Sequence, residues 1–264
     1  MNRIDKLFQR REKNILSVFY TAGFPGLNDT VTIARHLEAA GADMIEIGIP
    51  FSDPIADGPV IQRSNNRAIA NGMTLKLLLD QVKQIRQTVT MPLLLMGYLN
   101  PVLQYGVEKF FTDAAEAGAD GLILPDLPPE EFELKYRKKA MQAGIHVVFL
   151  VTPSSADERI RLLDSLSGGF LYAVSLSGVT GTRTSFTTEQ DEFLKRLQKL
   201  KLKNPVLAGF GISNSESFHA ACRLANGAIV GSAFISLLEN SHNLQAQIEG
   251  FIHNLRSLPV PEGK

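Results

Sequence analysis

The sequence contains little cysteine, no excess charge of either sign and no long apolar run. Its one cysteine, Cys222, cannot form a disulfide within the chain. The 27 Lys and Arg residues balance 27 Asp and Glu residues, which argues against binding to nucleic acid or to an anionic membrane. The longest apolar run, residues 91–99, is interrupted by Pro92 and Gly97 and is shorter than the roughly 18 residues of a membrane span. The amino terminus lacks the apolar segment of a signal peptide, so we expect a soluble, cytoplasmic protein.

Short runs of β-branched residues and leucine recur along the chain, and each is typical of a buried strand. Amphipathic segments of helical period lie between them. Because the runs lack polar alternation, both of their faces should be buried, as in a parallel sheet covered by helices. The expected strands are residues 15–20, 44–49, 92–96, 121–124, 146–151, 170–174, 205–208 and 228–230, and the expected helices are residues 29–40, 75–89, 108–117, 130–143, 157–166, 189–200 and 215–224.

About eight such units in roughly 250 residues favour an α/β fold of the (β/α)₈ TIM-barrel type. The alternative, a doubly wound open sheet, lacks its glycine fingerprint after the first strand, because residues 21–26 have the wrong spacing. We expect residues 1–264 to form one domain. Residues 3–12 predict an additional helix that closes the bottom of the barrel or, alternatively, binds a partner. The tail, residues 259–264, should be frayed.

Glu46 is the strongest catalytic candidate. The period of two in residues 44–49 turns this carboxylate toward the barrel interior, near the carboxyl ends of the strands where such barrels place their active sites. Burial would raise its pKa toward the range that suits proton transfer. A structural ion pair is the alternative, but neither flank of the strand offers a cation. The position therefore favours acid–base catalysis.

The segment that follows, residues 50–59, should bring Asp53 and Asp57 over the same mouth. Either carboxylate could be functional, although Asp-Pro and Asp-Gly are ordinary turn formers, and composition alone favours a structural role for both.

Three glycine-rich turns, residues 177–182, 209–213 and 231–232, follow the last three strands. Glycines let backbone N–H groups approach an oxyanion, and these loops of a barrel frequently bind phosphate. No predicted strand contains lysine, the five histidines show no metal-ligand spacing, and no Gly-x-Ser-x-Gly motif occurs. With these mechanisms excluded, the reaction that the sequence favours is acid–base chemistry by carboxylates on a phosphorylated small molecule.

Residues 46–59, Glu-Ile-Gly-Ile-Pro-Phe-Ser-Asp-Pro-Ile-Ala-Asp-Gly-Pro, resemble the signature of the tryptophan synthase α-subunit family. Supporting matches occur in order at residues 21–23, 100–101, 125–128, 178–181, 209–212 and 231–233. The resemblance covers nearly the full chain. It implies a lyase that cleaves indole-3-glycerol phosphate to indole and glyceraldehyde 3-phosphate in tryptophan biosynthesis.

The resemblance also implies roles for single residues. Glu46 and Asp57 would be the acid–base pair, with Glu46 moving a proton between indole C3 and the glycerol hydroxyl and Asp57 holding the indole N–H. Tyr172 would lie near the reacting end. The indole pocket would be formed by Phe19, Tyr98, Ile123, Val151 and Phe210, and the phosphate would be held by Thr180, Gly181, Gly211, Gly231 and Ser232.

A further implication is an α₂β₂ heterotetramer with a β subunit that carries pyridoxal phosphate, whereas this chain holds neither cofactor nor metal. Two alternatives stay open. One is an enzyme of the same fold with another reaction, which would require a lysine or another base on a strand. The other is a non-catalytic subunit that binds a phosphosugar and regulates its partner.

Overall fold

The computed structural model describes residues 1–175, 187–239 and 243–258, and its strands form one parallel sheet. The neighbours follow the order β5-β4-β3-β2-β1-β9-β8-β7-β6. The strands are β1 (Ile15–Thr21), β2 (Met44–Gly48), β3 (Leu93–Met96), β4 (Gly121–Ile123), β5 (His146–Val148), β6 (Leu150–Val151), β7 (Leu171–Ala173), β8 (Val206–Ala208) and β9 (Gly227–Val230).

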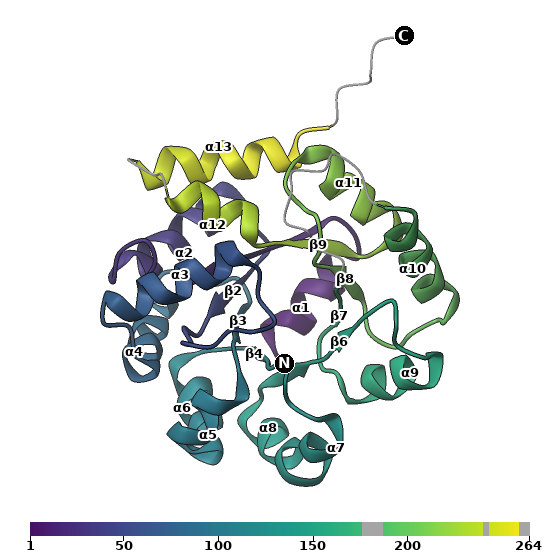
Figure 1. The fold of residues 1–264 in the computed structure, drawn as a ribbon, viewed down its shortest axis with the longest axis horizontal. Helices are drawn as coiled ribbons and strands as arrows, with labels where there is room; N and C mark the ends of the chain where they lie inside the picture. The colour runs from purple at the N-terminus through teal and green to yellow at the C-terminus, as the bar shows by residue number, and fades with distance from the viewer. Residues whose placement is uncertain (176–186, 240–242, 259–264) are drawn as a thin grey trace.

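The sheet closes into a barrel because β5 and β6 are two halves of one strand, separated only by Phe149. β5 pairs with β4, and β6 pairs with β7. Around the break, the carbonyl of Phe149 accepts a hydrogen bond of 3.0 Å from the N–H of Tyr172. The nine segments therefore make a ring of eight strands surrounded by helices (Figure 1), which confirms the predicted TIM barrel.

The helices cover the outside of the ring, and each of the seven segments predicted between the strands coincides with or overlaps at least one of them. The predicted helix at residues 130–143 is divided into a short α-helix, a π-helical turn and a second α-helix. The helices are α1 (Arg3–Arg10), α2 (Asp29–Ala40), α3 (Pro59–Ala70), α4 (Leu75–Arg86), α5 (Leu99–Tyr105), α6 (Val107–Ala117), α7 (Pro129–Glu131), η1 (Phe132–Tyr136), α8 (Arg137–Ala143), α9 (Asp157–Leu166), α10 (Thr188–Lys199), α11 (Ser215–Leu224), α12 (Ser232–Glu239) and α13 (Leu244–Arg256).

Two apolar cores flank the strands. The larger one lies mostly between the barrel and its helices, although it includes Phe19 of β1. The smaller one fills the barrel interior with side chains from nearly every strand, among them Met44, Leu94 and Leu207. Ile4 of α1 belongs to this inner core and is fully buried. α1 therefore lies across the amino-terminal end of the ring (Figure 1), although it ends at Arg10 rather than at the expected residue 12. The tail, residues 259–264, lies outside the described residues.

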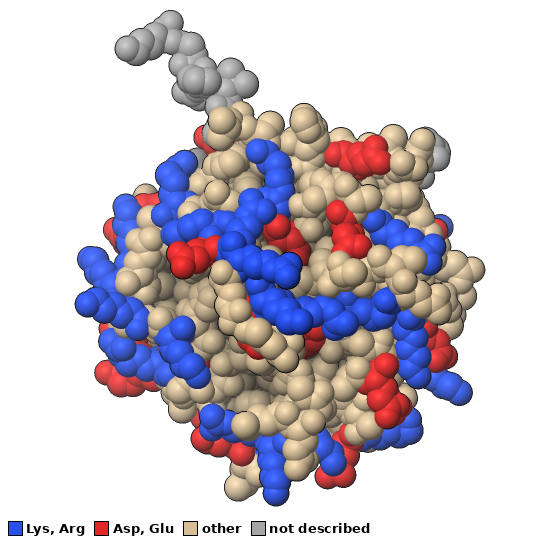
Figure 2. Space-filling model, turned by 180° about the vertical axis from the view of Figure 1, so that it is seen from behind, with Lys and Arg blue, Asp and Glu red and all other residues tan. Residues whose placement is uncertain are grey.

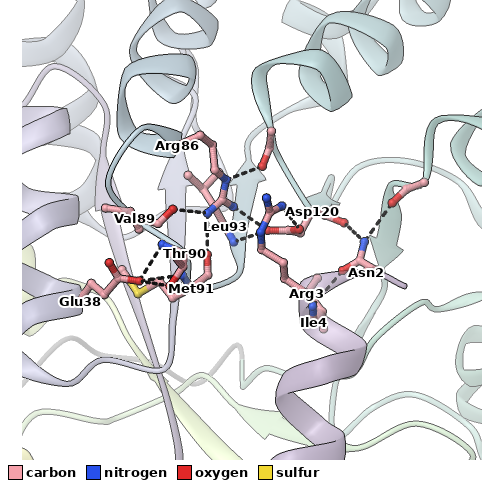
Figure 3. A network of polar contacts seen from close by, with 12 residues as sticks. Asn2, Arg3, Ile4, Glu38, Arg86, Val89, Thr90, Met91, Leu93 and Asp120 are labelled. Atoms are coloured by element: carbon pink, nitrogen blue, oxygen red, sulfur yellow. Dashed lines mark hydrogen bonds and ion pairs between the residues drawn. The ribbon is translucent and has the colours of Figure 1, made fainter.

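A buried polar network joins α1 to this end of the barrel (Figure 3). Asp120, which precedes β4, accepts hydrogen bonds from Arg3 at 2.9 Å, from Arg86 at 2.6 Å and from the backbone N–H of Leu93 at 2.9 Å. Asn2 caps α1 and also donates to the backbone carbonyl of Asp120 at 2.8 Å. The carboxylate thus ties α1, α4 and β3 together far from the opposite mouth.

Charges of both signs cover the surface. Seen from behind, Lys and Arg side chains gather toward the middle of the face in Figure 2, with Asp and Glu side chains among them. Some of the positive charge of the protein is neutralised locally, because Arg11 and Arg256 both pair with Asp43. Within the described residues, no helix combines the length and the apolar character needed to cross a membrane.

Candidate active site

Glu46 lies inside the barrel, as its sequence position predicts. In the parallel register it stands beside Phe19 of β1 and Leu94 of β3. Its side chain is fully buried, and it forms no ion pair with any described cation. Within the part of the chain that the structure describes, a structural ion pair is therefore not the reason for its burial.

The Glu46 carboxyl has one hydrogen-bond partner among the described residues. The hydroxyl of Ser17, on β1, donates to Oε1 at 2.7 Å, whereas the buried Oε2 has no partner there. Burial raises the pKa of Glu46 to about 7, and the Ser17 hydrogen bond opposes this rise. A carboxyl group with such a pKa can both donate and accept a proton near neutral pH.

Asp57 lies in the loop between β2 and α3, at the same mouth. It is partly buried, and burial raises the pKa of its carboxyl group. The hydroxyl of Tyr98, which follows β3, donates to Oδ2 of Asp57 at 3.1 Å and counteracts this rise. Asp53, the other carboxylate of the loop, is exposed and accepts a short hydrogen bond from the adjacent Ser52.

Tyr172 of β7 lies close enough to both carboxylates to feel their charge. Burial raises its pKa well above the ordinary value, and the negative charges of Glu46 and Asp57 raise it further. The ring depends on a glycine, because a Cβ atom at Gly209 would stand 2.0 Å from Tyr172 Cε2. Glu46, Asp57 and Tyr172 therefore lie near one another at the mouth.

Two of the residues expected around the indole ring take inward-facing positions on strands of the same barrel. The Phe19 ring lies between the ends of two strands, since a Cβ atom at Gly48 would be 2.8 Å from its Cζ and one at Gly231 would be 3.5 Å from its Cδ1. Ile123 ends β4 and belongs to the inner core. Tyr98 reaches the mouth through its bond to Asp57, as described above.

Val151 does not meet the expectation. It is fully buried, whereas its neighbour Leu150 packs against the inner core. The register agrees, because Leu150 pairs with the inward Tyr172 and Val151 pairs with the outward Ala173. On this strand, Leu150 rather than Val151 therefore faces the barrel interior.

The phosphate candidates lie partly within the described residues. Gly211 follows β8 with a φ of 68°, and Gly231 and Ser232 connect β9 to α12. The first intrahelical bond of α12 runs from the N–H of Ile235 to the carbonyl of Gly231 at 2.9 Å, which leaves the N–H groups of its first turn available for an anion. Thr180 and Gly181 lie outside the described residues. Phe210, between β8 and Gly211, is buried in the larger core.

Ser17 and Leu150 were missed by the sequence interpretation. The sequence carried a signal for Ser17, because it is a polar residue in an otherwise apolar run. None of the strands contains lysine, so the described barrel offers no strand-borne amine for the rival reaction types. Within the same residues, no group of three or more metal-ligating side chains comes together.

Comparison with protein families gives one consistent result. The model of the tryptophan synthase alpha chain matches residues 6–258. The chain is 50% identical over 256 residues to the tryptophan synthase alpha chain of Flavobacterium johnsoniae, covering 97% of this chain and all of the relative. It is 53% identical over 241 residues to that of Flavobacterium psychrophilum, covering 91% and 95% of the two chains.

Solved structures agree with the sequence relatives. The alpha subunit of tryptophan synthase from Legionella pneumophila superposes with a TM-score of 0.88 at 37% identity and covers 97% of both chains. A chain in the tryptophan synthase complex from Pyrococcus furiosus gives a TM-score of 0.84 at 34% identity, covering 93% of this chain and 98% of that one. The similarity therefore extends through the barrel and its mouth.

Proposed function

The chain belongs to the tryptophan synthase alpha chain family, and on this basis we propose that Glu46 and Asp57 are its acid–base pair. The reaction of this enzyme family cleaves indole-3-glycerol phosphate in tryptophan biosynthesis. The observation that carries the proposal is the buried carboxyl of Glu46, whose Oε2 has no partner among the described residues and whose pKa is about 7.

The first step would transfer the proton of neutral Glu46 to indole C3. The ring then becomes a cation, which the charged Asp57 stabilises at the ring N–H. The hydrogen bond from Tyr98 favours the ionised form of Asp57 that this role requires. The indole ring is thus prepared to accept an electron pair.

In the second step, the Glu46 carboxylate accepts the proton of the hydroxyl on the carbon attached to C3. That carbon becomes the aldehyde of glyceraldehyde 3-phosphate as the carbon–carbon bond breaks, and the electron pair of this bond returns to the ring. Neutral indole leaves, and Glu46 is protonated again. Protons and electrons balance without an external acid, and the ring takes the part that a lysine Schiff base plays in other retro-aldol enzymes.

The remaining residues would bind the two ends of the substrate. We assign the indole ring to the part of the mouth where Glu46, Asp57 and Tyr172 lie near one another. Its walls would come from Phe19, Tyr98, Ile123, Leu150 and Phe210, and the phosphate would meet the backbone N–H groups of Gly211, Gly231 and Ser232 together with Thr180 and Gly181.

We further propose that the chain works in the cytoplasm with a tryptophan synthase β subunit, in an α₂β₂ heterotetramer whose pyridoxal phosphate is bound by the partner. Support comes from the family and from the Pyrococcus furiosus relative that was solved as a tryptophan synthase complex. A partner that consumes indole at once would also prevent the loss of this small, uncharged product.

Replacement of Glu46 by glutamine tests the central assignment. We expect Glu46→Gln to lower indole formation from indole-3-glycerol phosphate by about 10²–10⁴-fold, the usual effect of removing a general acid–base, while binding to the β subunit is retained. Glu12→Gln, at an exposed position before β1, is the matched control. Undiminished turnover by Glu46→Gln would remove Glu46 from the mechanism, whereas a wild-type chain that forms no indole, alone or with the β subunit, would have a regulatory, non-catalytic role instead.

A further inference from the structure

Ser17 is a buried hydroxyl at the centre of an apolar strand. Residues 15–20 read Ile-Leu-Ser-Val-Phe-Tyr, and Ser17 is fully buried among them. Its Oγ lies 2.7 Å from Oε1 of Glu46, and this is the hydrogen bond that the side chain makes within the described residues. Burying a hydroxyl in a barrel interior is unfavourable unless it is bonded, so the contact explains the presence of serine here.

The hydrogen bond distinguishes the two oxygens of Glu46. Oε1 accepts from Ser17, whereas Oε2 is buried and has no partner in the described part of the chain. A carboxyl group keeps an acceptor lone pair on the oxygen that bears no proton. The Ser17 bond can therefore persist in both ionisation states of Glu46 only if the proton resides on Oε2.

Among the residues that the structure describes, only Ser17 is hydrogen-bonded to the Glu46 side chain. Its register neighbours, Phe19 and Leu94, are apolar. The titratable group that interacts electrostatically with Glu46 at the mouth is Tyr172. Its pKa is raised by the charges of both Glu46 and Asp57. Among the described cations, none forms an ion pair with Glu46. Ser17 is thus the group that fixes the carboxyl orientation.

We propose that Ser17 is a positioning residue, which orients Glu46 so that Oε2 alone presents the transferable proton to the substrate. This inference rests on the proposed acid–base role of Glu46. In addition, the Ser17 hydrogen bond favours the carboxylate and so limits the rise of the Glu46 pKa that burial causes. Without Ser17, the proton could occupy either oxygen, and Glu46 would release it less readily.

Two variants of Ser17 test the proposal. Ser17→Ala removes the donor, and Ser17→Cys retains a weak donor of similar shape. Infrared difference spectra, assigned by comparison with Glu46→Gln, report the carboxyl C=O stretch and so the Glu46 pKa directly. We expect this pKa to rise by about one pH unit in Ser17→Ala, because a hydrogen bond to a charged group is lost, and by less in Ser17→Cys.

Kinetics provide a second measurement. Since neutral Glu46 starts the proposed reaction, kcat/KM should fall as the pH rises through the Glu46 pKa, and this alkaline limb should move to higher pH in Ser17→Ala. The ionisation of the substrate phosphate is common to all variants and cancels in the comparison. We expect kcat to fall about tenfold through loss of orientation, with KM unchanged.

Thr21→Val is the matched control. Thr21 is also a buried hydroxyl of β1, and its Oγ1 lies 2.7 Å from Oγ of Ser64 rather than from Glu46. Its replacement should lower stability without moving the Glu46 pKa.

If Ser17→Cys and every folded Ser17→Ala sample titrated like the wild type, the positioning role would be overturned, while an inactive Glu46→Gln would still support the proposed function. Full turnover by Glu46→Gln would instead remove the proposed acid–base role of Glu46, and the infrared titration would still test the Ser17–Glu46 contact.

Discussion

The hydroxyl of Tyr98 links Asp57 to the end of β3. It donates to Oδ2 of Asp57 at 3.1 Å and accepts the backbone N–H of Ala56 at the same distance. The ring centroid of Phe51 lies 5.3 Å from that of Tyr98. One phenol therefore fixes both the backbone and the carboxylate of the β2–α3 loop, and it favours the charged form of Asp57.

We predict that Tyr98→Phe impairs catalysis while the fold is preserved. Loss of a hydrogen bond to a charged group costs about 1.5–3 kcal/mol, so kcat/KM for indole formation should fall by roughly 10- to 100-fold. The pKa of Asp57 should rise further, because the opposing hydrogen bond is gone.

Tyr136→Phe is the control, since the Tyr136 hydroxyl donates a hydrogen bond to Glu131 on the outer helices at 3.4 Å. Equal kcat/KM in the two variants would show that the loop needs no anchor.

The barrel could be predicted from sequence because its strands are buried on both faces, so each appears as an uninterrupted apolar run. Glu46 stood out as the charged residue within such a run. The sequence did not predict α3. The residues that this helix buries are Ser64, Asn65 and Ala68, and they do not form the pattern of apolar residues that is typical of an amphipathic helix. This helix is stabilised by packing against β1 and the loops, and not by an amphipathic pattern of its own.

The sequence interpretation also placed the wrong residue of β6 inward, Val151 in place of Leu150, for a related reason. Residues 147–151 are all apolar, so the run gives no signal for which alternate residues face inward. That choice is made by pairing with β7, where Tyr172 stands beside Leu150. The bonds from Tyr98 to Asp57 and from Ser17 to Glu46 were likewise beyond prediction, because they join residues 41 and 29 positions apart.

Glu46 should make stability depend on pH. Its pKa is about 7 in the folded protein, against an ordinary value of 4.5. The fold therefore favours the neutral form, and the stabilisation is complete below about pH 4.5 and is lost as the pH rises to about 7. The loss should be on the order of 3 kcal/mol.

The measurement is the free energy of unfolding in urea from pH 4.5 to 7.5, for the wild type and for Glu46→Gln. Glutamine does not titrate, so the variant should gain about 3 kcal/mol relative to the wild type across this range. The other carboxylates contribute equally to both proteins. A constant difference between the two would mean that Glu46 has an ordinary pKa.

Asp120 should be essential for stability and dispensable for chemistry. Its carboxylate binds Arg3 and the largely buried Arg86 (Figure 3). Asp120→Asn leaves the Arg86 charge without its carboxylate partner, and breaking such a buried pair costs about 3–5 kcal/mol. Urea unfolding measures the loss, and kcat of the remaining folded enzyme should be close to that of the wild type.

Asp113→Asn is the control for this prediction. Asp113 pairs with Lys109 one turn away on the surface of α6, where such pairs contribute about 0.3–0.5 kcal/mol. Comparable destabilisation by the two substitutions would contradict the assignment of Asp120 as the link between α1, α4 and β3.

Gly209 should be required for the position of Tyr172. A Cβ atom at Gly209 would stand 2.0 Å from Cε2 and 2.6 Å from the hydroxyl oxygen of Tyr172, so Gly209→Ala must displace the ring from the space beside Glu46. We expect a stability loss of about 1–3 kcal/mol from overpacking and a fall in kcat/KM of at least about tenfold.

Gly250→Ala in α13 is the control, since nothing lies within 4 Å of its Cβ position. A glycine-to-alanine change in a helix should stabilise the protein by about 0.5–1 kcal/mol, and kcat/KM should not change. If Gly209→Ala lost stability but kept full kcat/KM, Tyr172 would be a packing residue and would have to be removed from the proposed site.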